Sequence, residues 1–482
     1  MLNTCSRDED STMNSEGESS SCGYRWDAIS ARRMADCIHN EVRQMVGTSR
    51  LVRKTEGVAL VNRSELTVGK IMGKGAFSEV HEVCLTNDPR RRRYAMKHLK
   101  MKLMSQPDNF RLAAAELAVE AHMLASFDHP NILKIQGWAA NGVASFVEGA
   151  HDSFFLLLDC LDETLDQRIL KWQHDEDFLT QHRAPPTCLM DVWRQTLADD
   201  VGSTCSCNST DVITAEKNQI HLEKLKVLAE IAAALSYLHD RGVIFRDLKP
   251  NNIGLLNGRV QIFDFGLSRE LPGCDLTEPF EMSGKVGTLR YMAVEVASHQ
   301  RYNVSADVYS WAMVCYETIT CKKPFAGWTR EMHQDLVCHQ GMRPDIQCVP
   351  STLKPLLNAC WDQNPHARPT MAQAHQQILY LEEQQVFLCL QQQQAKQQQA
   401  AAEAAAAVQQ QQLLQQQQQQ MQAASVYQAQ ARTPTPPHLY PVANPVTVEL
   451  PIGFDVHKSP SRHFSETYTA ATLSLSNDSY GF

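Results

Sequence analysis

The sequence lacks any run of about eighteen apolar residues, which is the length that a membrane-spanning helix needs. Its first residues, Met1 to Asp10, are polar and acidic, and no apolar stretch stands behind them. A secretory signal is therefore not expected. We expect a soluble protein without a membrane span, located in the cytoplasm.

An excess of positive charge is missing as well. The 482 residues carry a formal net charge of -9, and the pI is near 6.1. These values argue against a protein that binds nucleic acid by neutralising phosphates over a broad surface. One basic run, Arg90 to Arg93, follows the turn signal Asp88-Pro89. We interpret it as a solvated hairpin tip. The alternative is a docking or nuclear import patch, which would add the nucleus to the expected location.

Cysteines at the spacing of a disulfide framework or a zinc site are also missing. The fifteen cysteines are scattered and odd in number, and most lie inside apolar runs such as Val314-Cys315-Tyr316. Cys205 and Cys207 form the one close pair, without histidines or a second pair at zinc-finger spacing. We therefore expect reduced cysteines that mostly lie in the core.

The residues that are present are distributed unevenly. Serine, glutamate and asparagine crowd the first 25 positions, glutamine and alanine crowd 384–432, and 433–482 is rich in proline, serine and threonine. Such composition predicts disordered tails around one folded unit. We expect an N-terminal extension over 1–65 and a folded domain over 66–383.

Two segments outside this domain have helical character. In the extension, Ile29, Met34, Ile38, Val42 and Val46 recur at helical spacing and predict an amphipathic helix over 26–46. This helix either packs on the folded domain, which we favour, or docks a partner. The 384–432 segment either continues as a helix or is disordered, since glutamine and alanine both favour helix. Its apolar residues do not keep a heptad for long, so a coiled coil is not favoured and the oligomeric state stays open.

The pattern of the folded domain changes along its length. Strand-like stretches separated by turns and one alanine- and leucine-rich helix cover the first part: 66–72, 79–85, 94–99 and the helix 113–127. Beyond Leu161 helical periodicity dominates, interrupted by a polar insertion over about 173–219. The fold class is therefore α+β, with a small β-rich lobe and a larger helical lobe.

A glycine-bearing stretch, Gly73-Lys74-Gly75-Ala76-Phe77-Ser78, lies between two predicted strands and is followed by Val80. Missing side chains let backbone amides approach phosphate oxygens closely. Alone, the stretch is equally typical of an ordinary hairpin. Dinucleotide binding is disfavoured because the motif enters a strand rather than a helix.

A lysine ends the next apolar strand, in Tyr94-Ala95-Met96-Lys97. A lysine in a buried strand needs a partner, and Glu120 of the following helix can supply one. The alternative is two unrelated surface charges. The motifs further along the chain favour a buried ion pair, in which Lys97 reaches the α and β phosphates of a nucleotide.

The most informative stretch runs from Phe245 through Asn252 and is followed by Asp264-Phe265-Gly266. Asp247 can accept a proton from a hydroxyl, and Lys249 can neutralise charge on a moving phosphoryl group. Asn252 and Asp264 offer the oxygen ligands that suit magnesium, or manganese in its place. These residue types are those required for phosphoryl transfer from a bound nucleotide.

Residues 66–383 resemble the catalytic domain of eukaryotic protein kinases. Further matches support the resemblance: Gly287-Thr288, Ala293-Val294-Glu295, Asp307 with Trp311, and Cys360-Trp361 through Arg368-Pro369. Lys249 and Thr288 are similar to serine/threonine kinases, and the surrounding segments resemble the tyrosine-kinase-like group. The resemblance implies the bilobal kinase fold, ATP with Mg²⁺ or Mn²⁺, and transfer of a γ-phosphoryl group to serine or threonine hydroxyls of protein substrates in signalling.

The same resemblance implies roles for individual residues. Lys97 and Glu120 would act with Asp247 and Lys249 in catalysis, and Glu295 and Arg368 would form a buried ion pair. Leu158 falls at the gatekeeper position, and 159–161 form the hinge. The residues that would bind the nucleotide are Gly73, Lys74, Gly75, Ala76, Phe77, Ser78, Val80, Ala95, Lys97, Leu158, Asp159, Leu161 and Gly254.

Four positions depart from the usual kinase residues. Phe245 replaces a histidine and can keep the aromatic stacking with Phe265, while Ser78 replaces a glycine and Val294 a proline. Gly254 lies under the adenine where a leucine is usual, so the base would lose apolar contact. None of the four removes a catalytic residue. The alternative function is a catalytically weak or inactive pseudokinase scaffold that assembles partners through its tails.

Control by an upstream kinase that phosphorylates the activation segment, from Asp264 to Glu295, is expected as well. The alternative is that this segment is ordered without phosphate. In the family, the arginine at the position of Arg246 commonly pairs with a phosphate on the activation segment. We favour Thr277 or Ser283 as the phosphorylated residue. Thr288 is better placed to contact Asp247 and Lys249.

Overall fold

The computed structural model describes residues 25–51, 57–181, 209–272, 278–284 and 287–430. The predicted disordered segments over 1–24 and 433–482, Thr277 and the Cys205–Cys207 pair lie outside these residues. Residues up to Ala401 form one compact unit, and the residues after it belong to a second. No helix in the described part of the chain is both long and apolar enough to cross a membrane.

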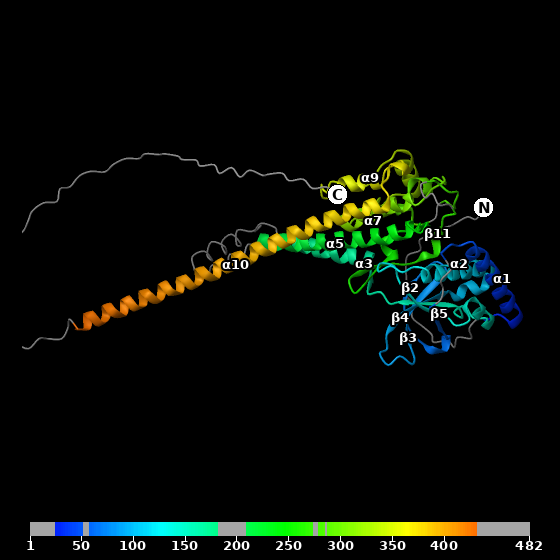
Figure 1. Cartoon of the computed structure of the whole chain (residues 1–482), viewed down its shortest axis with the longest axis horizontal. Helices are drawn as coiled ribbons and strands as arrows, with labels where there is room; N and C mark the ends of the chain where they lie inside the picture. Colours follow the sequence, from blue (N-terminus) through cyan, green and yellow to red (C-terminus); the bar gives the residue numbers. More distant parts are fainter. Residues whose placement is uncertain (1–24, 52–56, 182–208, 273–277, 285–286, 431–482) are drawn as a thin grey trace, which may run out of the picture. The chain divides into compact units, whose positions relative to one another are not determined.

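The first lobe is built on a six-stranded sheet with the strand order β1-β5-β6-β4-β3-β2. All neighbouring strands are antiparallel except β1 and β5, which run parallel. Figure 1 shows these strands together with helices α1 and α2 at one side of the molecule. The strands are β1 (Ala59–Val61), β2 (Leu66–Lys74), β3 (Ser78–Leu85), β4 (Arg93–Leu99), β5 (Ile135–Ala139) and β6 (Phe155–Asp159).

Two helices accompany this sheet. Helix α1 (Ala28–Gly47) begins at Asp27, whose carboxylate accepts hydrogen bonds from the backbone amides of Ile29 and Ser30. It occupies the segment where the sequence predicts a helix over 26–46. Helix α2 (Pro107–Ala125) begins six residues before the predicted helix, because Pro107 at its first position is pre-set for a helix start.

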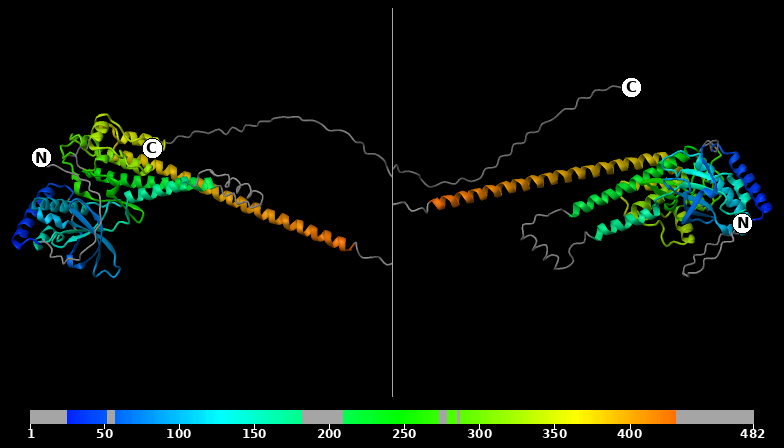
Figure 2. Two further views of the ribbon diagram at one scale, coloured as in Figure 1. Left: turned by 180° about the vertical axis from the view of Figure 1, so that it is seen from behind. Right: turned by 90° about the horizontal axis from the view of Figure 1, so that it is seen from below.

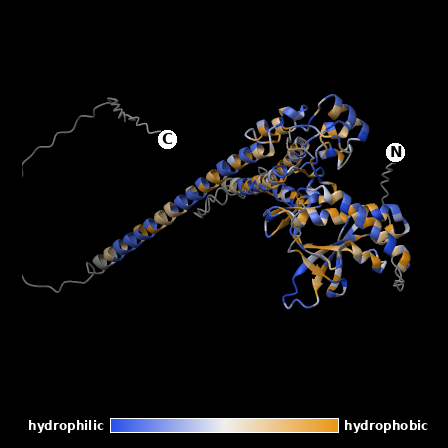
Figure 3. Ribbon diagram, turned by 45° about the vertical axis from the view of Figure 1, so that its right-hand side comes forward, coloured by the Kyte–Doolittle hydropathy of each residue, from blue (hydrophilic) through white to orange (hydrophobic). Residues whose placement is uncertain are grey.

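The connection between β3 and β4 contains Arg90 to Arg92 and is hydrophilic (Figure 3), and Arg93 is the first residue of β4. The Arg92 guanidinium lies 2.9 Å from Asp88, and Arg93 lies 3.5 Å from Glu82. The run is therefore a hairpin tip in the structure.

The second lobe is mainly helical (Figure 2). It also carries two small sheets, one of three strands and one of two. Its helices are α3 (Leu165–Gln181), α5 (Ser209–His239), α6 (Val294–Ala297), α7 (Ser305–Thr320), α8 (Arg330–Met332), α9 (Lys354–Cys360) and α10 (Met371–Gln430), with a π-helical segment, His333–His339. The short strands are β7 (Glu163–Thr164), β8 (Val243–Ile244), β9 (Ile253–Leu256), β10 (Arg259–Ile262) and β11 (Arg269–Glu270). Short 3₁₀ turns are Arg63–Glu65, Met101–Ser105, Gly142–Glu148, Pro250–Asn252, Phe265–Leu267, Leu289–Tyr291 and Pro365–Ala367.

The core of this lobe forms around α7, which is buried from Ala306 to Ile319. The Trp311 indole donates a hydrogen bond to the carbonyl of Leu228 in α5, at 3.2 Å. The predicted α+β architecture, with a small β-rich lobe and a larger helical lobe, is thus confirmed.

The predicted polar insertion over about 173–219 has helical flanks in the structure. Helix α3 continues to Gln181 and α5 begins at Ser209, and 182–208 lies outside the described residues. The Lys224 ammonium lies 2.6 Å from Glu176, and the Trp172 indole donates to Glu223 at 3.3 Å. These contacts hold the polar flanks together as a pair of helices, which a composition argument does not detect.

The glutamine- and alanine-rich segment is helical as far as Gln430, as part of α10. At the start of α10, Met371, Ala374 and Ile378 are buried in the core. Gln385 and Gln392 still hydrogen-bond Asn218 of α5, at 3.1 and 3.0 Å. The nine cysteines of the described residues are all free thiols, and three of them are buried.

Candidate active site

The glycine-bearing stretch forms the turn between β2 and β3. The Gly75 amide donates to the carbonyl of Ser78 at 2.9 Å, which closes the turn over Ala76 and Phe77. A Cβ at Gly75 would lie 3.1 Å from the Ser78 hydroxyl oxygen, so this tight turn favours glycine. Ser78 itself is the first residue of β3. Phe77, Gly75 and Ala76 are exposed and leave backbone amides accessible at the tip.

Sheet register places the predicted nucleotide-binding residues of the strands beside one another. Val80 of β3 lies opposite Lys97 of β4, and Ala95 lies opposite Leu158 of β6. Ala95 and Leu158 are buried, whereas Val80 is half-buried. These side chains form an apolar patch next to the Lys97 ammonium.

Lys97 is held between two carboxylates. Its Nζ lies 2.8 and 2.7 Å from the two oxygens of Glu120 and 2.8 Å from Asp264 Oδ1. Burial opposes the charged lysine, but the two carboxylates outweigh burial and raise its pKa above the ordinary value. The Lys97 ammonium conversely lowers the pKa of Asp264. The structure therefore brings the predicted Lys97–Glu120 pair together and adds Asp264 to it.

Asp247 is the centre of a second hydrogen-bonded cluster. Lys249 Nζ lies 2.7 Å from its Oδ2, and the Thr288 amide and hydroxyl donate to its Oδ1 at 3.0 and 3.2 Å. Lys249 also donates to the Thr288 hydroxyl at 3.1 Å. Gly287 has φ +97° and a Cβ there would collide with the carbonyl of Arg246, so glycine allows Thr288 this close approach.

The two candidate metal ligands flank these clusters. Asn252 donates through its Nδ2 to the backbone carbonyl and the carboxylate of Asp247, both at 2.9 Å, so its amide oxygen is the end that remains for a cation. Among the described residues no group of three His, Cys, Asp or Glu side chains could hold a metal ion. Magnesium, however, commonly takes one or two protein oxygens together with substrate phosphates. Asn252 and ionised Asp264 fit that requirement.

A buried aspartate fixes the loop that carries Asp247. Asp307 of α7 accepts hydrogen bonds from the amides of Phe245 and Arg246, at 2.7 and 2.9 Å, and contacts His239 Nε2 at 3.0 Å. Arg246 and Asp264 both have positive φ, 72° and 67°. Non-glycine residues in this conformation are typical of sites where the surrounding structure imposes the backbone.

The predicted stacking of Phe245 is present in the structure. Its ring meets that of Phe265 edge-on at 5.1 Å, and Phe265 in turn lies 5.2 Å from Phe127. An aromatic ring therefore stands where the family usually has a histidine, and it packs against Phe265, the residue after Asp264.

The absence of a side chain at Gly254 is explained by its neighbour Leu161. A Cβ at Gly254 would overlap the methyl groups of Leu161. The Leu161 side chain thus occupies the space that a larger residue at 254 would fill. The sequence does not indicate that Leu161 fills the space at Gly254, because the two residues meet only across the β7–β9 region.

Arg246 lies among groups from the activation segment. Its guanidinium donates to the Leu267 carbonyl at 2.6 Å, to the Ser283 hydroxyl at 3.3 Å and to the Tyr302 hydroxyl at 2.9 Å. Burial and the charge of Arg246 lower the pKa of Arg269. The positive charges of Arg246 and Arg269 therefore lie close enough to affect each other. Ser283, which contacts Arg246, is exposed.

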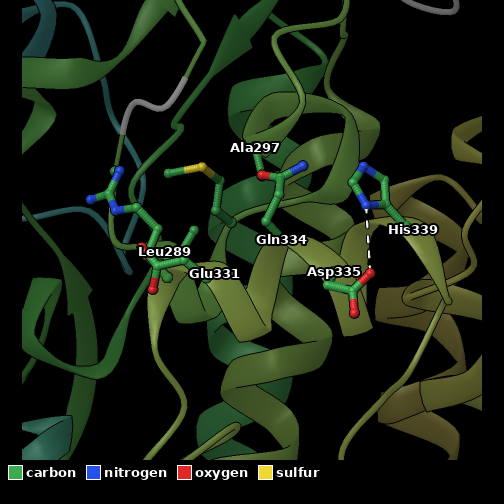
Figure 4. A pocket seen from close by; sticks show the side chains of 9 residues that line it. Leu289, Ala297, Glu331, Gln334, Asp335 and His339 are labelled. Carbon is green, nitrogen blue, oxygen red and sulfur yellow. Dashed lines mark ion pairs between the residues drawn. The ribbon is translucent and has the colours of Figure 1, made fainter.

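A cavity of about 450 Å³ lies beyond Thr288 (Figure 4). One side comes from the segment after Thr288, with Leu289, Met292 and Ala297, and the other from α8 and the π-helical segment. In the latter, Asp335 lies 3.9 Å from His339. The remaining lining residues are Gly287, Arg330, Glu331 and Gln334. The cavity thus opens next to the Asp247 cluster.

The expected ion pair of the large lobe is also present. Arg368 contacts both oxygens of Glu295, at 2.7 and 2.8 Å, and both side chains are almost fully buried. The pair fixes α6, which follows the cavity-lining segment.

The chain belongs to the protein tyrosine and serine/threonine kinase family, whose sequence model matches residues 66–378. A probable serine/threonine-protein kinase of Dictyostelium discoideum is 27% identical over 326 residues, 66% of this chain and 20% of its own length. A serine/threonine/tyrosine-protein kinase of Arabidopsis thaliana is 39% identical over 149 residues, 30% of this chain and 36% of its own length. A serine/threonine-protein kinase of the same plant is 34% identical over 162 residues, 32% of this chain and 36% of its own length. The predicted family is thereby confirmed, and the chain matches no more than 36% of the length of these relatives.

Proposed function

We propose that this protein is an ATP-dependent protein kinase that phosphorylates serine and threonine residues of other proteins in intracellular signalling. The observation that carries the proposal is a pair of hydrogen-bonded clusters, Lys97–Glu120–Asp264 and Asp247–Lys249–Thr288. The first is suited to hold phosphates, and the second to activate a hydroxyl next to them.

The chain's own residues divide the work between them. The tip at Gly75 would cover the phosphates, and Lys97, fixed by Glu120, would bind the α and β phosphates. Asp247 would accept the proton of the attacking hydroxyl while Lys249 neutralises charge on the moving phosphoryl group. Thr288 ties both residues to the activation segment, and this link supports serine and threonine as acceptors.

Asn252 and Asp264 would hold Mg²⁺, or Mn²⁺ in its place, which neutralises phosphate charge when bound. The side chains of Val80, Ala95 and Leu158 would contact the adenine from one side. We infer that Leu161 contacts it from the other side, in place of the residue missing at Gly254. The hinge at 159–161 would hydrogen-bond the base through its backbone.

The protein substrate would lie along the cavity, because its lining residues Gly287 and Leu289 flank Thr288, which hydrogen-bonds Asp247. We further infer an upstream activating kinase that phosphorylates Ser283 or Thr277. The chain would act in the cytoplasm, with entry to the nucleus through Arg90 to Arg93 as the alternative location. We further propose that the kinase domain spans residues 66–383.

The test is transfer of label from γ-labelled ATP with magnesium to myelin basic protein, beside an Asp247→Asn variant. We expect label on phosphoserine or phosphothreonine that is lost in the variant. The other candidate, a pseudokinase scaffold, is favoured if the wild-type chain binds ATP, carries a phosphorylated activation segment and still transfers no label.

A further inference from the structure

The N-terminal extension is attached to the helix that carries Glu120. Helix α1 packs against α2 and against the 3₁₀ turn Gly142–Glu148, and Figure 1 shows α1 beside α2. Its inward face is fully or nearly fully buried at Ala31, Ala35, Ile38 and Val42. This apolar face is the main source of attachment, since buried apolar area dominates such contacts.

A tryptophan fixes the start of this segment. The Trp26 indole donates a hydrogen bond to the Met104 carbonyl at 3.2 Å, and its ring meets Phe110 of α2 edge-on at 4.6 Å. The Trp26 amide also donates to the Gly149 carbonyl at 3.1 Å. The contact therefore lies at the N-terminal end of α2.

Polar and charged groups connect the segment to α2, which carries Glu120, and to β11, which follows Asp264 in the chain. Glu41 of α1 forms an ion pair with Arg111 of α2. Beyond α1, the Ser49 hydroxyl donates to Glu270 at 2.6 Å, and the Arg50 guanidinium contacts Glu270 at 3.2 Å. Glu270 lies in β11, in the segment that begins at Asp264.

Two elements that must hold their carboxylates near Lys97 are thus joined by one segment. Helix α2 supplies Glu120, and the chain before β11 supplies Asp264. We propose that residues 26–51 form a positioning brace that keeps α2 and the Asp264 segment in the arrangement needed for nucleotide binding. The brace lies outside the family match, which begins at residue 66, and the inference rests on the proposed kinase function for its kinetic readout.

A positioning brace and simple surface packing predict different effects of releasing α1. If α1 only covers apolar surface, its release lowers the amount of folded protein and leaves the KM for ATP of the remaining enzyme unchanged. If it positions Glu120, its release also weakens ATP binding, because Lys97 loses its fixed partner. The two roles therefore differ in KM and in the local opening of α2.

The decisive comparison uses the full chain with Ile38→Glu, which places a carboxylate at a fully buried position, against Ile29→Glu. Ile29 lies on the same helix and is 68% exposed. Hydrogen exchange of 28–47 and of 107–125 is measured together with kcat and the KM for ATP. We expect Ile38→Glu to raise exchange in both segments, to raise the KM for ATP and to lower kcat/KM about tenfold or more. Ile29→Glu is expected to match the wild type.

The brace is overturned if 28–47 exchanges freely in Ile38→Glu while exchange of 107–125 and the KM for ATP stay at wild-type values. If Ile38→Glu does not fold, the milder Ile38→Ala is judged by the same criterion. A charge exchange gives an independent arm: Glu41→Arg should raise exchange of 107–125, and Glu41→Arg with Arg111→Glu should restore it. Hydrogen exchange does not depend on activity, so failure of the kinase assay alone leaves this outcome readable.

Discussion

At the scale of single residues, the side chains of the candidate site are brought together over very different separations in the sequence. Asp247, Lys249 and Asn252 lie within six residues, so their cluster follows from the sequence of one loop. Lys97 and Glu120 are 23 residues apart, and a strand followed by a helix brings them together. Leu161 and Gly254 meet only in the folded chain, and one sequence alone contains no sign that they share a space.

The first prediction concerns the space that Leu161 and Gly254 share. Gly254→Leu should collide with Leu161 and push its side chain toward the nucleotide, so that ATP affinity falls about tenfold or more, since overpacking costs about 1–3 kcal/mol. Gly254→Leu with Leu161→Ala should recover most of the loss. The measurement is the ATP dissociation constant by titration of the purified variants. An equally weak double variant would show that Leu161 does not fill this space.

A second prediction at this scale concerns pH. Burial in β4 lowers the pKa of His98 to about 4, below the ordinary 6.5. Between these values the unfolded chain binds one proton more than the folded chain at this residue, so stability falls as the pH falls from about 6.5 to about 4. The contribution at stake is about 3 kcal/mol.

His98→Gln should therefore reduce the pH dependence of the free energy of unfolding by about one proton in this range. Chemical denaturation at several pH values between these limits gives that slope. His174→Gln is the matched control, because the His174 side chain is 82% exposed. His333, whose pKa is also lowered to about 4 by burial, keeps part of the slope in His98→Gln. If the pH dependence of the free energy of unfolding is unchanged in His98→Gln, the lowered pKa of His98 is contradicted.

At the scale of elements, the activation segment is where a charge can change the structure. Ser283 is exposed and its hydroxyl accepts a hydrogen bond from Arg246 at 3.3 Å. A phosphate on Ser283 would meet the guanidinium of Arg246, with Arg269 near, and charge-assisted hydrogen bonds of this kind order a loop. Ser268 of the same segment is buried and is not available for phosphorylation in the folded state.

We therefore predict that the active protein carries phosphate on Ser283 and none on Ser268. Ser283→Ala should lower kcat severalfold, by about 1 kcal/mol or more of lost interaction, with the KM for ATP little changed. Peptide mapping by mass spectrometry and steady-state kinetics provide the two measurements. Phosphate found elsewhere in the segment, with full activity of Ser283→Ala, would assign control to another residue.

Elements also show where periodicity succeeds and where composition fails. The apolar spacing of 26–46 identifies α1 because one face of that helix is buried. The polar flanks of the predicted insertion form the ends of α3 and α5, and their composition gives no sign of this. Their contacts, such as Glu176 with Lys224, join residues 48 positions apart, and such pairing is invisible to a window of neighbouring residues.

At the scale of the whole molecule, the brace lies before the matched domain, and the long helix α10 begins inside it and extends beyond its last residue. The brace depends on contacts of very long sequence separation, such as Ser49 with Glu270, 221 residues apart. The family resemblance could not predict it, because it lies before the matched residues. Helix α10 is different, since it begins inside the core and continues past it.

The last prediction follows from where the buried residues of α10 lie. Met371, Ala374 and Ile378 are buried, and the hydrogen bonds to Asn218 end at Gln392. Ending the chain after Thr370 should remove these three side chains, at a cost of about 2–5 kcal/mol for each large one, and abolish folding. Ending it after Ala401 removes no buried residue of the described chain, so the thermal midpoint and kcat should match those of the full chain. Circular dichroism melts and kinase assays of the two shortened proteins measure this difference. A change in kcat on ending the chain after Ala401, with an unchanged melt, would instead assign the removed segment a regulatory contact with the kinase unit.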